Sequence, residues 1–276
     1  MPARAHNALA VPPHLINDRV IGRGAYGVVF RALVKHSTER VAVKQVTPID
    51  GDRTDYLRLL REIKIARLVR HENILPLIDA YQRSTSTFLV FPLMDTDLHY
   101  VIKSGQEITD EHCRYFCSQL FDGLHALHSV DVVHRDIKPS NILVNKDCDL
   151  RIADFGLARG ALSSPASPVD PASPPMLCRQ LTEYVVTRWY RAPEVLVENA
   201  YGPPIDLWAA GCILAELLGR RALFQGRDYR HMLQLIMKEL GKPDDRAELA
   251  FIEDAQARQF CERHRQAGLE LSLIHI

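Results

Sequence analysis

The chain of 276 residues is 47% apolar, enough to bury a substantial core in one large domain or in two lobes that share a cleft. Its 34 basic and 34 acidic residues cancel, which argues against nucleic acid or a membrane surface as the main partner. The six cysteines show no metal-ligand spacing and no apolar stretch approaches about eighteen residues, so we expect a soluble intracellular protein without a signal peptide or membrane span.

Residues 19–93 are predicted to form a small, mostly β lobe that follows an N-terminal extension of residues 1–18. The runs VIGRGAYGVVFRALV, RVAVKQV and TFLVF are rich in residues that favour strands. Between the second and third runs, DYLRLLREIKIARLV has the apolar spacing of one amphipathic helix.

Residues 94–276 are predicted to form a larger, mainly α lobe, which gives the chain an α+β fold with two lobes. Apolar residues recur at three- and four-residue intervals from Phe116 to Leu127, and PIDLWAAGCILAELLG is apolar nearly all round. Residues 159–180 are rich in proline, serine and alanine, so we expect a mobile loop within this lobe.

The first chemical signal is a run of glycines between two predicted strands. Gly22, Gly24 and Gly27 in IGRGAYGVV would let backbone amides approach a triphosphate, although the same run also suits an ordinary hairpin. Lys44 in VAVK is placed to reach phosphates from the next strand. Glu62 lies on the apolar, inward face of the following helix, so we expect its carboxylate to pair with Lys44.

The most specific signal is HRDIKPSNIL, residues 134–143. Eighteen residues after Asp136 comes Asp154 in DFG, and APE follows at residues 192–194. The ordered series of glycine loop, lysine, glutamate, HRD, DFG and APE resembles that of eukaryotic protein kinases. The resemblance implies the bilobal kinase fold and transfer of the γ-phosphate of ATP to a protein hydroxyl.

The resemblance also implies a role for each residue of the catalytic loop. Asp136 would orient the substrate hydroxyl and accept its proton, and Lys138 would neutralise the γ-phosphate. Asn141 and Asp154 would hold Mg²⁺, which prefers oxygen ligands. ATP and Mg²⁺ are therefore the expected cofactors, and Lys44 with Glu62 completes the expected catalytic set.

The expected ATP site combines the glycine loop with an apolar slot for the adenine. FPLMDTDL would form the hinge between the lobes, with Phe91 behind the adenine pocket. The slot residues also suit ordinary core packing, because an adenine site is itself apolar. The expected ATP-binding residues are Ile21, Gly22, Arg23, Gly24, Ala25, Tyr26, Gly27, Val29, Ala42, Lys44, Met94 and Leu143.

Thr182, Glu183 and Tyr184 form TEY and are followed by VVTRWYRAPEV, so the segment 154–194 resembles the activation segment of extracellular-signal-regulated mitogen-activated protein kinases. The resemblance implies that an upstream dual-specificity kinase phosphorylates Thr182 and Tyr184. The expected phosphate-clamping residues are Arg61, Arg135 and Arg159 for Thr182, and Arg188 and Arg191 for Tyr184.

We therefore expect a monomeric, proline-directed serine/threonine kinase of a phosphorylation cascade, located in the cytoplasm and also in the nucleus. Its expected partners are protein substrates, the upstream kinase, phosphatases and docking proteins. One alternative is a non-catalytic module that keeps the kinase fold only to bind a partner. A cyclin-dependent-type kinase shares the catalytic core, but the TEY motif argues against it.

The resemblance extends from about Arg19 to Asp245 and then fades in LAFIEDAQARQFCERHRQAGLELSLIHI. A complete member of the family would continue through further helices. We therefore expect a fragment, or an altered C-terminus from about residue 258, and a larger lobe that is incomplete at this end.

Overall fold

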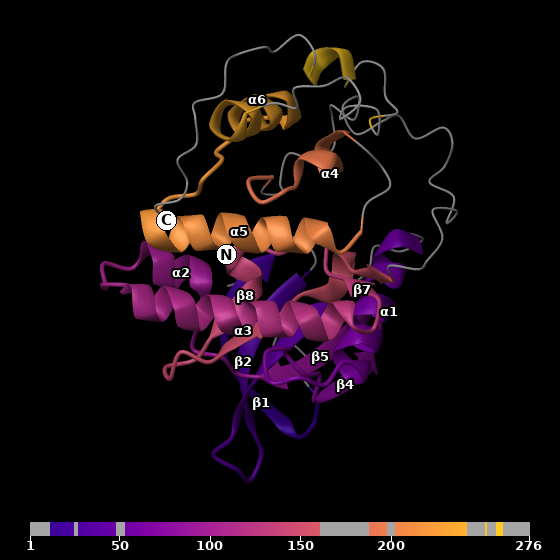
Figure 1. Ribbon diagram of the computed structural model, residues 1–276. Coiled ribbons are helices and arrows are strands. Elements are labelled where there is room, and N and C mark those ends of the chain that lie inside the picture. The colour runs from indigo at the N-terminus through magenta and orange to yellow at the C-terminus, as the bar shows by residue number, and fades with distance from the viewer. Residues whose placement is uncertain are drawn as a thin grey trace, which may run out of the picture.

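The computed structural model describes residues 12–24, 27–47, 53–160, 188–197, 202–241, 252 and 258–261. Figure 1 shows the sheet toward the bottom, α4, α5 and α6 toward the top, and α3 between them. The α+β class and the division into a β-rich and a helical lobe are confirmed. Ala25, Tyr26, Thr182, Tyr184 and most of the C-terminal tail lie outside the described residues.

The small lobe is built on an antiparallel sheet in the order β1-β2-β3-β5-β4. Its strands alternate buried apolar and more exposed side chains, because successive residues of a strand point to opposite faces. The first strand begins within the predicted N-terminal extension. The strands are β1 (Leu15–Gly24), β2 (Gly27–Val34), β3 (Arg40–Val46), β4 (Asp79–Arg83) and β5 (Ser86–Pro92).

The predicted helix of the small lobe is α1 (Arg53–Leu68). Leu59, Glu62 and Ala66 are buried along one face, as their three- and four-residue spacing predicts. This face contacts the short 3₁₀ helix η2 (Phe155–Leu157) of the larger lobe. A carboxylate is thereby held between the two lobes.

The larger lobe is helical, and its core lies between α3 and α5, which pack side by side (Figure 1). Thr109 begins α3 with a capping box, in which its side chain and that of His112 accept each other's backbone N–H groups. No helix in the described ranges is long and apolar enough to cross a membrane. The helices are α2 (Leu98–Lys103), α3 (Asp110–His128), α4 (Pro193–Val197), α5 (Pro204–Gly219) and α6 (Tyr229–Leu240).

Short strands between the lobes carry the predicted catalytic motifs, and the sequence analysis did not predict them. One small sheet has the order β6-β8-β9, and a second pairs β10 with β7. The 3₁₀ helix η1 (Pro139–Asn141) directly precedes β8. The strands are β6 (Thr96–Asp97), β7 (Val132–Val133), β8 (Ile142–Val144), β9 (Leu150–Ile152) and β10 (Arg159–Gly160).

Candidate active site

The structure brings Lys44 of β3 and Glu62 of α1 together, as the sequence predicts. Lys44 Nζ lies 2.6 Å from Glu62 Oε1 and 3.3 Å from Asp154 Oδ1. The Glu62 side chain is buried, so its charge needs a partner at this distance. One ammonium thus connects the sheet, the helix α1 and the DFG motif.

The ionisation of these groups follows from burial and from their neighbours. Burial alone would lower the pKa of Lys44, but the carboxylates of Glu62 and Asp154 raise it above its ordinary value. Burial would raise the pKa of Asp154, but the positive charge of Lys44 holds it below its usual range. Burial raises the pKa of Glu62, and Lys44 offsets this only in part. Asp154 is therefore anionic at neutral pH.

The side chains of the HRD loop converge on Asp136. Lys138 Nζ donates to Asp136 Oδ2 at 2.6 Å, and Asn141 Nδ2 donates to the same oxygen at 3.0 Å. Asn141 Nδ2 also donates to the Asp136 carbonyl oxygen at 2.8 Å. Because its amide nitrogen makes these bonds, the amide oxygen of Asn141 is left as a ligand or acceptor.

Asp206 of α5 anchors the HRD loop through hydrogen bonds, and the sequence analysis did not predict this role. The buried Asp206 carboxylate accepts the backbone N–H groups of His134 and Arg135, both at 2.8 Å, and lies 2.9 Å from His128 Nε2. These bonds fix the turn in which Arg135 adopts a left-handed φ of 71°. The signal in the sequence was a carboxylate in the mostly apolar run PIDLWAAGCILAELLG, which also contains Glu216.

The DFG turn is attached to the same loop. Asp154 has a left-handed φ of 68°, and the Phe155 side chain that follows is buried. The Phe155 and His134 rings meet edge to face with centroids 5.4 Å apart, and His134 Nε2 lies 3.0 Å from the Ala153 carbonyl oxygen. The backbone N–H of Ala153 donates to the Asn141 carbonyl oxygen at 2.9 Å. Asp136, Asn141 and Asp154 therefore belong to one connected unit.

The predicted adenine slot is lined by half-buried apolar side chains. Ala42 of β3 pairs in register with Phe91 of β5. Ala42, Met94 and Leu143 are partly buried and pack against the main core, and Phe91 belongs to that core. Val29 of β2 is also half-buried and pairs in register with Lys44. Apolar side chains of this kind suit contact with a planar base.

The predicted phosphate loop occupies the β1–β2 hairpin, in which Gly24 pairs with Gly27 and Gly22 with Val29. A Cβ at Gly27 would overlap the Gln45 carbonyl oxygen, so only glycine fits there. A Cβ at Gly22 would lie 3.7 Å from the Val29 Cβ, an ordinary contact. Of the predicted loop residues, Ile21, Gly22, Arg23, Gly24 and Gly27 are described, and Ala25 and Tyr26 are not.

The donor set fits a magnesium ion that is shared with phosphates. Asn141 and Asp154 supply an amide and a carboxylate oxygen, the hard ligands that Mg²⁺ prefers. Mg²⁺ commonly takes only one or two protein ligands and completes its shell with waters and substrate phosphates. Within the described residues, no group of three or more His, Cys, Asp and Glu side chains is arranged to hold a metal.

Two of the predicted phosphate-clamping arginines lie close enough to interact electrostatically. Burial, and then the positive charge of Arg135, lower the pKa of Arg61, whose buried Nη1 has no hydrogen-bond partner. Arg159 Nη1 donates to the carbonyl oxygens of Ala158 at 2.9 Å and Leu157 at 3.3 Å. The region around Arg61 and Arg135 is therefore electropositive, and Arg61 Nη1 lacks a hydrogen-bond acceptor there.

The other two predicted arginines meet at Tyr229 of α6. Arg191 Nη1 donates to the Tyr229 hydroxyl at 2.8 Å, and the Arg188 guanidinium lies 5.0 Å from the centre of the Tyr229 ring. Their predicted phosphorylated partner, Tyr184, lies outside the described residues, as does Thr182. The structure thus places Arg61 near Arg135 and Arg188 near Arg191, and it does not describe the residues that these arginines are predicted to bind.

The chain is similar to known proteins over most of its length. A family model described as "Protein kinase domain" matches residues 15–263. The chain is 47% identical over 247 residues to "Mitogen-activated protein kinase 7" of Arabidopsis thaliana, covering 87% of this chain and 63% of that protein. It is 45% identical over 261 residues to "Mitogen-activated protein kinase 4a" of Physcomitrium patens, covering 92% and 66%. The chain therefore spans less than two thirds of the length of these curated relatives.

Proposed function

Because the chain belongs to the protein kinase family, we propose that it is an ATP- and Mg²⁺-dependent serine/threonine kinase of the mitogen-activated type, proline-directed and part of a phosphorylation cascade. One observation carries the proposal: Lys44, Glu62 and Asp154 form one charged cluster, and Asp136, Lys138 and Asn141 form another beside it. The similar proteins of Arabidopsis thaliana and Physcomitrium patens support the subfamily.

Each cluster suits one part of phosphoryl transfer. Lys44, held by Glu62, is placed to neutralise the non-transferred phosphates of ATP. Asn141 and Asp154 would hold Mg²⁺, which supplies charge neutralisation at the phosphates when bound. Asp136 can orient a serine or threonine hydroxyl and accept its proton, and Lys138, 2.6 Å from Asp136, is a cation at the site of transfer.

Mg-ATP should raise the midpoint of thermal unfolding of the purified chain. At a nucleotide concentration 100 times the Kd, binding to the folded state alone stabilises it by about 2.7 kcal/mol. We expect the Asp154→Asn variant to lose the shift that depends on Mg²⁺, and the exposed Asp147→Asn variant to keep it. Differential scanning fluorimetry with and without Mg²⁺ makes the comparison. A midpoint that Mg-ATP does not move in the unaltered chain would contradict the proposal.

We also propose that phosphorylation of Thr182 and Tyr184 activates the enzyme. The orphan Nη1 of Arg61, together with the nearby charge of Arg135, supports an anion-binding role for this part of α1. A phosphate there would relieve the repulsion between the two arginines and couple the activation segment to the helix that carries Glu62.

The double variant Thr182→Ala, Tyr184→Phe should therefore stay at basal activity after treatment with an activating dual-specificity kinase. The unaltered chain should gain activity in the same reaction, because the added phosphates order the segment. Phosphotransfer to a Ser-Pro peptide gives the readout, and mass spectrometry confirms the modification. Full activity of the unphosphorylatable variant would refute this mode of regulation.

A further inference from the structure

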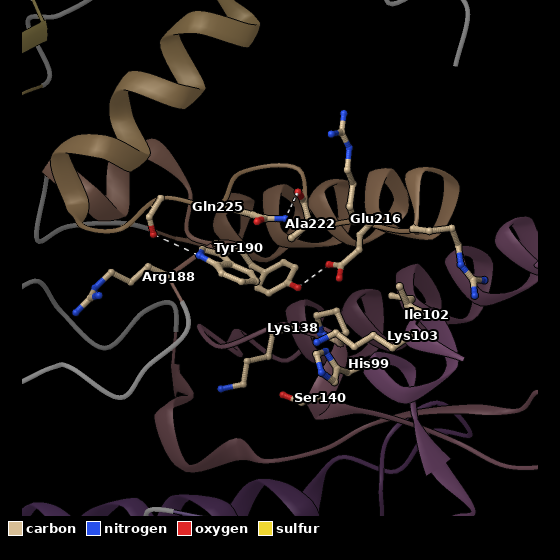
Figure 2. A pocket seen from close by; sticks show the side chains of 15 residues that line it. His99, Ile102, Lys103, Lys138, Ser140, Arg188, Tyr190, Glu216, Ala222 and Gln225 are labelled. Carbon is tan, nitrogen blue, oxygen red and sulfur yellow. Dashed lines mark hydrogen bonds between the residues drawn. The ribbon is translucent and has the colours of Figure 1, made fainter. Parts of the chain in front are cut away.

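A pocket of about 720 Å³ lies beside the catalytic loop and shares Lys138 and Arg188 with the site described above, but most of its lining has no role assigned there. Its walls come from α2, from residues 138–140, from residues 188–190, and from the C-terminal end of α5 with the loop that follows. Figure 2 shows Lys138, Ser140, His99 and Lys103 along one wall, with Tyr190 and Glu216 opposite.

The pocket is strongly basic, although the chain as a whole carries no net charge. Its only carboxylate in the described lining is Glu216, which is buried and accepts a hydrogen bond of 2.5 Å from the Tyr190 hydroxyl. Burial, and then the hydrogen bond to Glu216, raise the pKa of Tyr190, so this hydroxyl keeps its proton. The cations of the lining are Lys103, Lys138, Arg188, Arg220 and Arg221.

Arg220 is the residue that points most directly to a ligand. It ends α5 in a left-handed conformation, with φ 57°, and its Nη2 donates to the Ser104 carbonyl oxygen at 2.5 Å. Its Nη1 is buried and has no hydrogen-bond partner. A buried guanidinium nitrogen without an acceptor is unfavourable, and a carboxylate or phosphate is the acceptor that matches it best.

The position of the pocket identifies where such an anion would come from. Lys138 lines the pocket and also contacts Asp136, so a chain that presents its hydroxyl to Asp136 passes the mouth of the pocket. Lys103 and Arg221 are exposed and can meet a side chain of that chain. The ligand that fits is an anionic residue of the same protein substrate.

We propose that this pocket selects protein substrates that carry a carboxylate or phosphate side chain near the phosphoacceptor. This inference rests on the proposed kinase function and adds a determinant of substrate specificity to it. Arg220 would donate a hydrogen bond to the anion from its orphan Nη1, and the positive charges of Lys103 and Arg221 would attract the anion.

The test uses Ser-Pro peptides in which one glutamate is moved through the positions on both sides of the serine. Each peptide is compared with its glutamine counterpart, and a phosphoserine series distinguishes a phosphate from a carboxylate. We expect kcat/KM to be about 10-fold higher for the anionic peptide at one or two positions, the effect of one charge-assisted hydrogen bond. Equal values for glutamate, phosphoserine and glutamine peptides throughout the series would overturn the proposal.

Charge reversal separates specificity from general damage. In the Lys103→Glu, Arg221→Glu variant we expect the preference for glutamate to vanish and a lysine peptide to become the better substrate. Arg227→Glu, an exposed change outside the pocket, should keep the original preference. A variant that merely folds poorly would lose all peptides alike, whereas an unchanged glutamate preference would refute the assignment.

Peptide binding tests the pocket separately from the proposed kinase activity. If no peptide is phosphorylated, the proposed function fails, and the Kd values of the same peptides, measured by fluorescence anisotropy, test the pocket alone. About 10-fold tighter binding of the anionic peptide, lost in the Lys103→Glu, Arg221→Glu variant, supports the pocket. Equal Kd values for glutamate and glutamine peptides contradict it.

Discussion

The Asp136→Asn variant should lose about 10²–10⁴-fold in kcat, because general-base catalysis contributes about that factor. An amide cannot take the proton of the substrate hydroxyl. The amide is also a weaker acceptor for the hydrogen bonds that Lys138 and Asn141 donate. Their nitrogens lie 2.6 Å and 3.0 Å from Asp136 Oδ2. The KM for ATP should change little, since the Lys44 and Asp154 cluster is untouched. Steady-state phosphotransfer to a Ser-Pro peptide measures both constants.

The matched control for this experiment is Asp147→Asn, an exposed carboxylate a short distance along the chain. It removes the same charge and should retain the full kcat. If the Asp136→Asn variant kept its activity, the hydroxyl would have to be activated by another group, and the assignment of Asp136 would be wrong. Nucleotide-dependent stabilisation with no phosphotransfer by the unaltered chain would instead favour a binding module over an enzyme.

The Asp206→Asn variant should be less stable by about 2–5 kcal/mol, the cost of weakening a buried carboxylate that satisfies several donors. One of its oxygens accepts the N–H of Arg135 and the other accepts that of His134 and contacts His128. An asparagine can offer only one oxygen, so a buried donor loses its acceptor. The kcat should fall as well, because these bonds hold the loop that carries Asp136.

Urea denaturation measures this loss of stability, with a lower midpoint at an unchanged slope as the expected sign. Asp122→Asn, an exposed change on α3, is the control and should stay within about 0.5 kcal/mol of the unaltered chain. Equal stability of the Asp206→Asn variant would mean that the loop is held by other contacts.

Local patterns predicted much of the framework. The period of α1 placed Glu62 on the same face as Leu59 and Ala66, and all three are buried. The runs VIGRGAYGVVFRALV and RVAVKQV were likewise predicted to form strands, and Phe30, Val41 and Val43 of β2 and β3 lie in the core of the small lobe. These predictions succeed because helix and strand geometry fixes the direction of each side chain relative to its neighbours along the chain.

Other features had no local signal. The strands β6, β7 and β10 are two residues long, too short to show a period, and they form only because a distant segment offers its backbone groups. In the sequence, Asp206 is only a charged residue within an apolar helix. Its role is seen only when α5 packs against the HRD loop and the carboxylate accepts the N–H groups of His134 and Arg135. The position of the Arg220 guanidinium depends in the same way on Ser104, 116 residues away along the chain, whose carbonyl oxygen accepts a hydrogen bond from Nη2.

The sequence by itself determined the order of the motifs, the kinds of groups available for catalysis and the division into a β-rich and a helical lobe. Only the tertiary structure decided that Lys44 meets Asp154 across 110 residues, that Asp206 supports the loop, and that a basic pocket opens beside Asp136. The reason is physical: side-chain direction within an element follows from backbone geometry, whereas distances between elements follow from how their apolar faces pack.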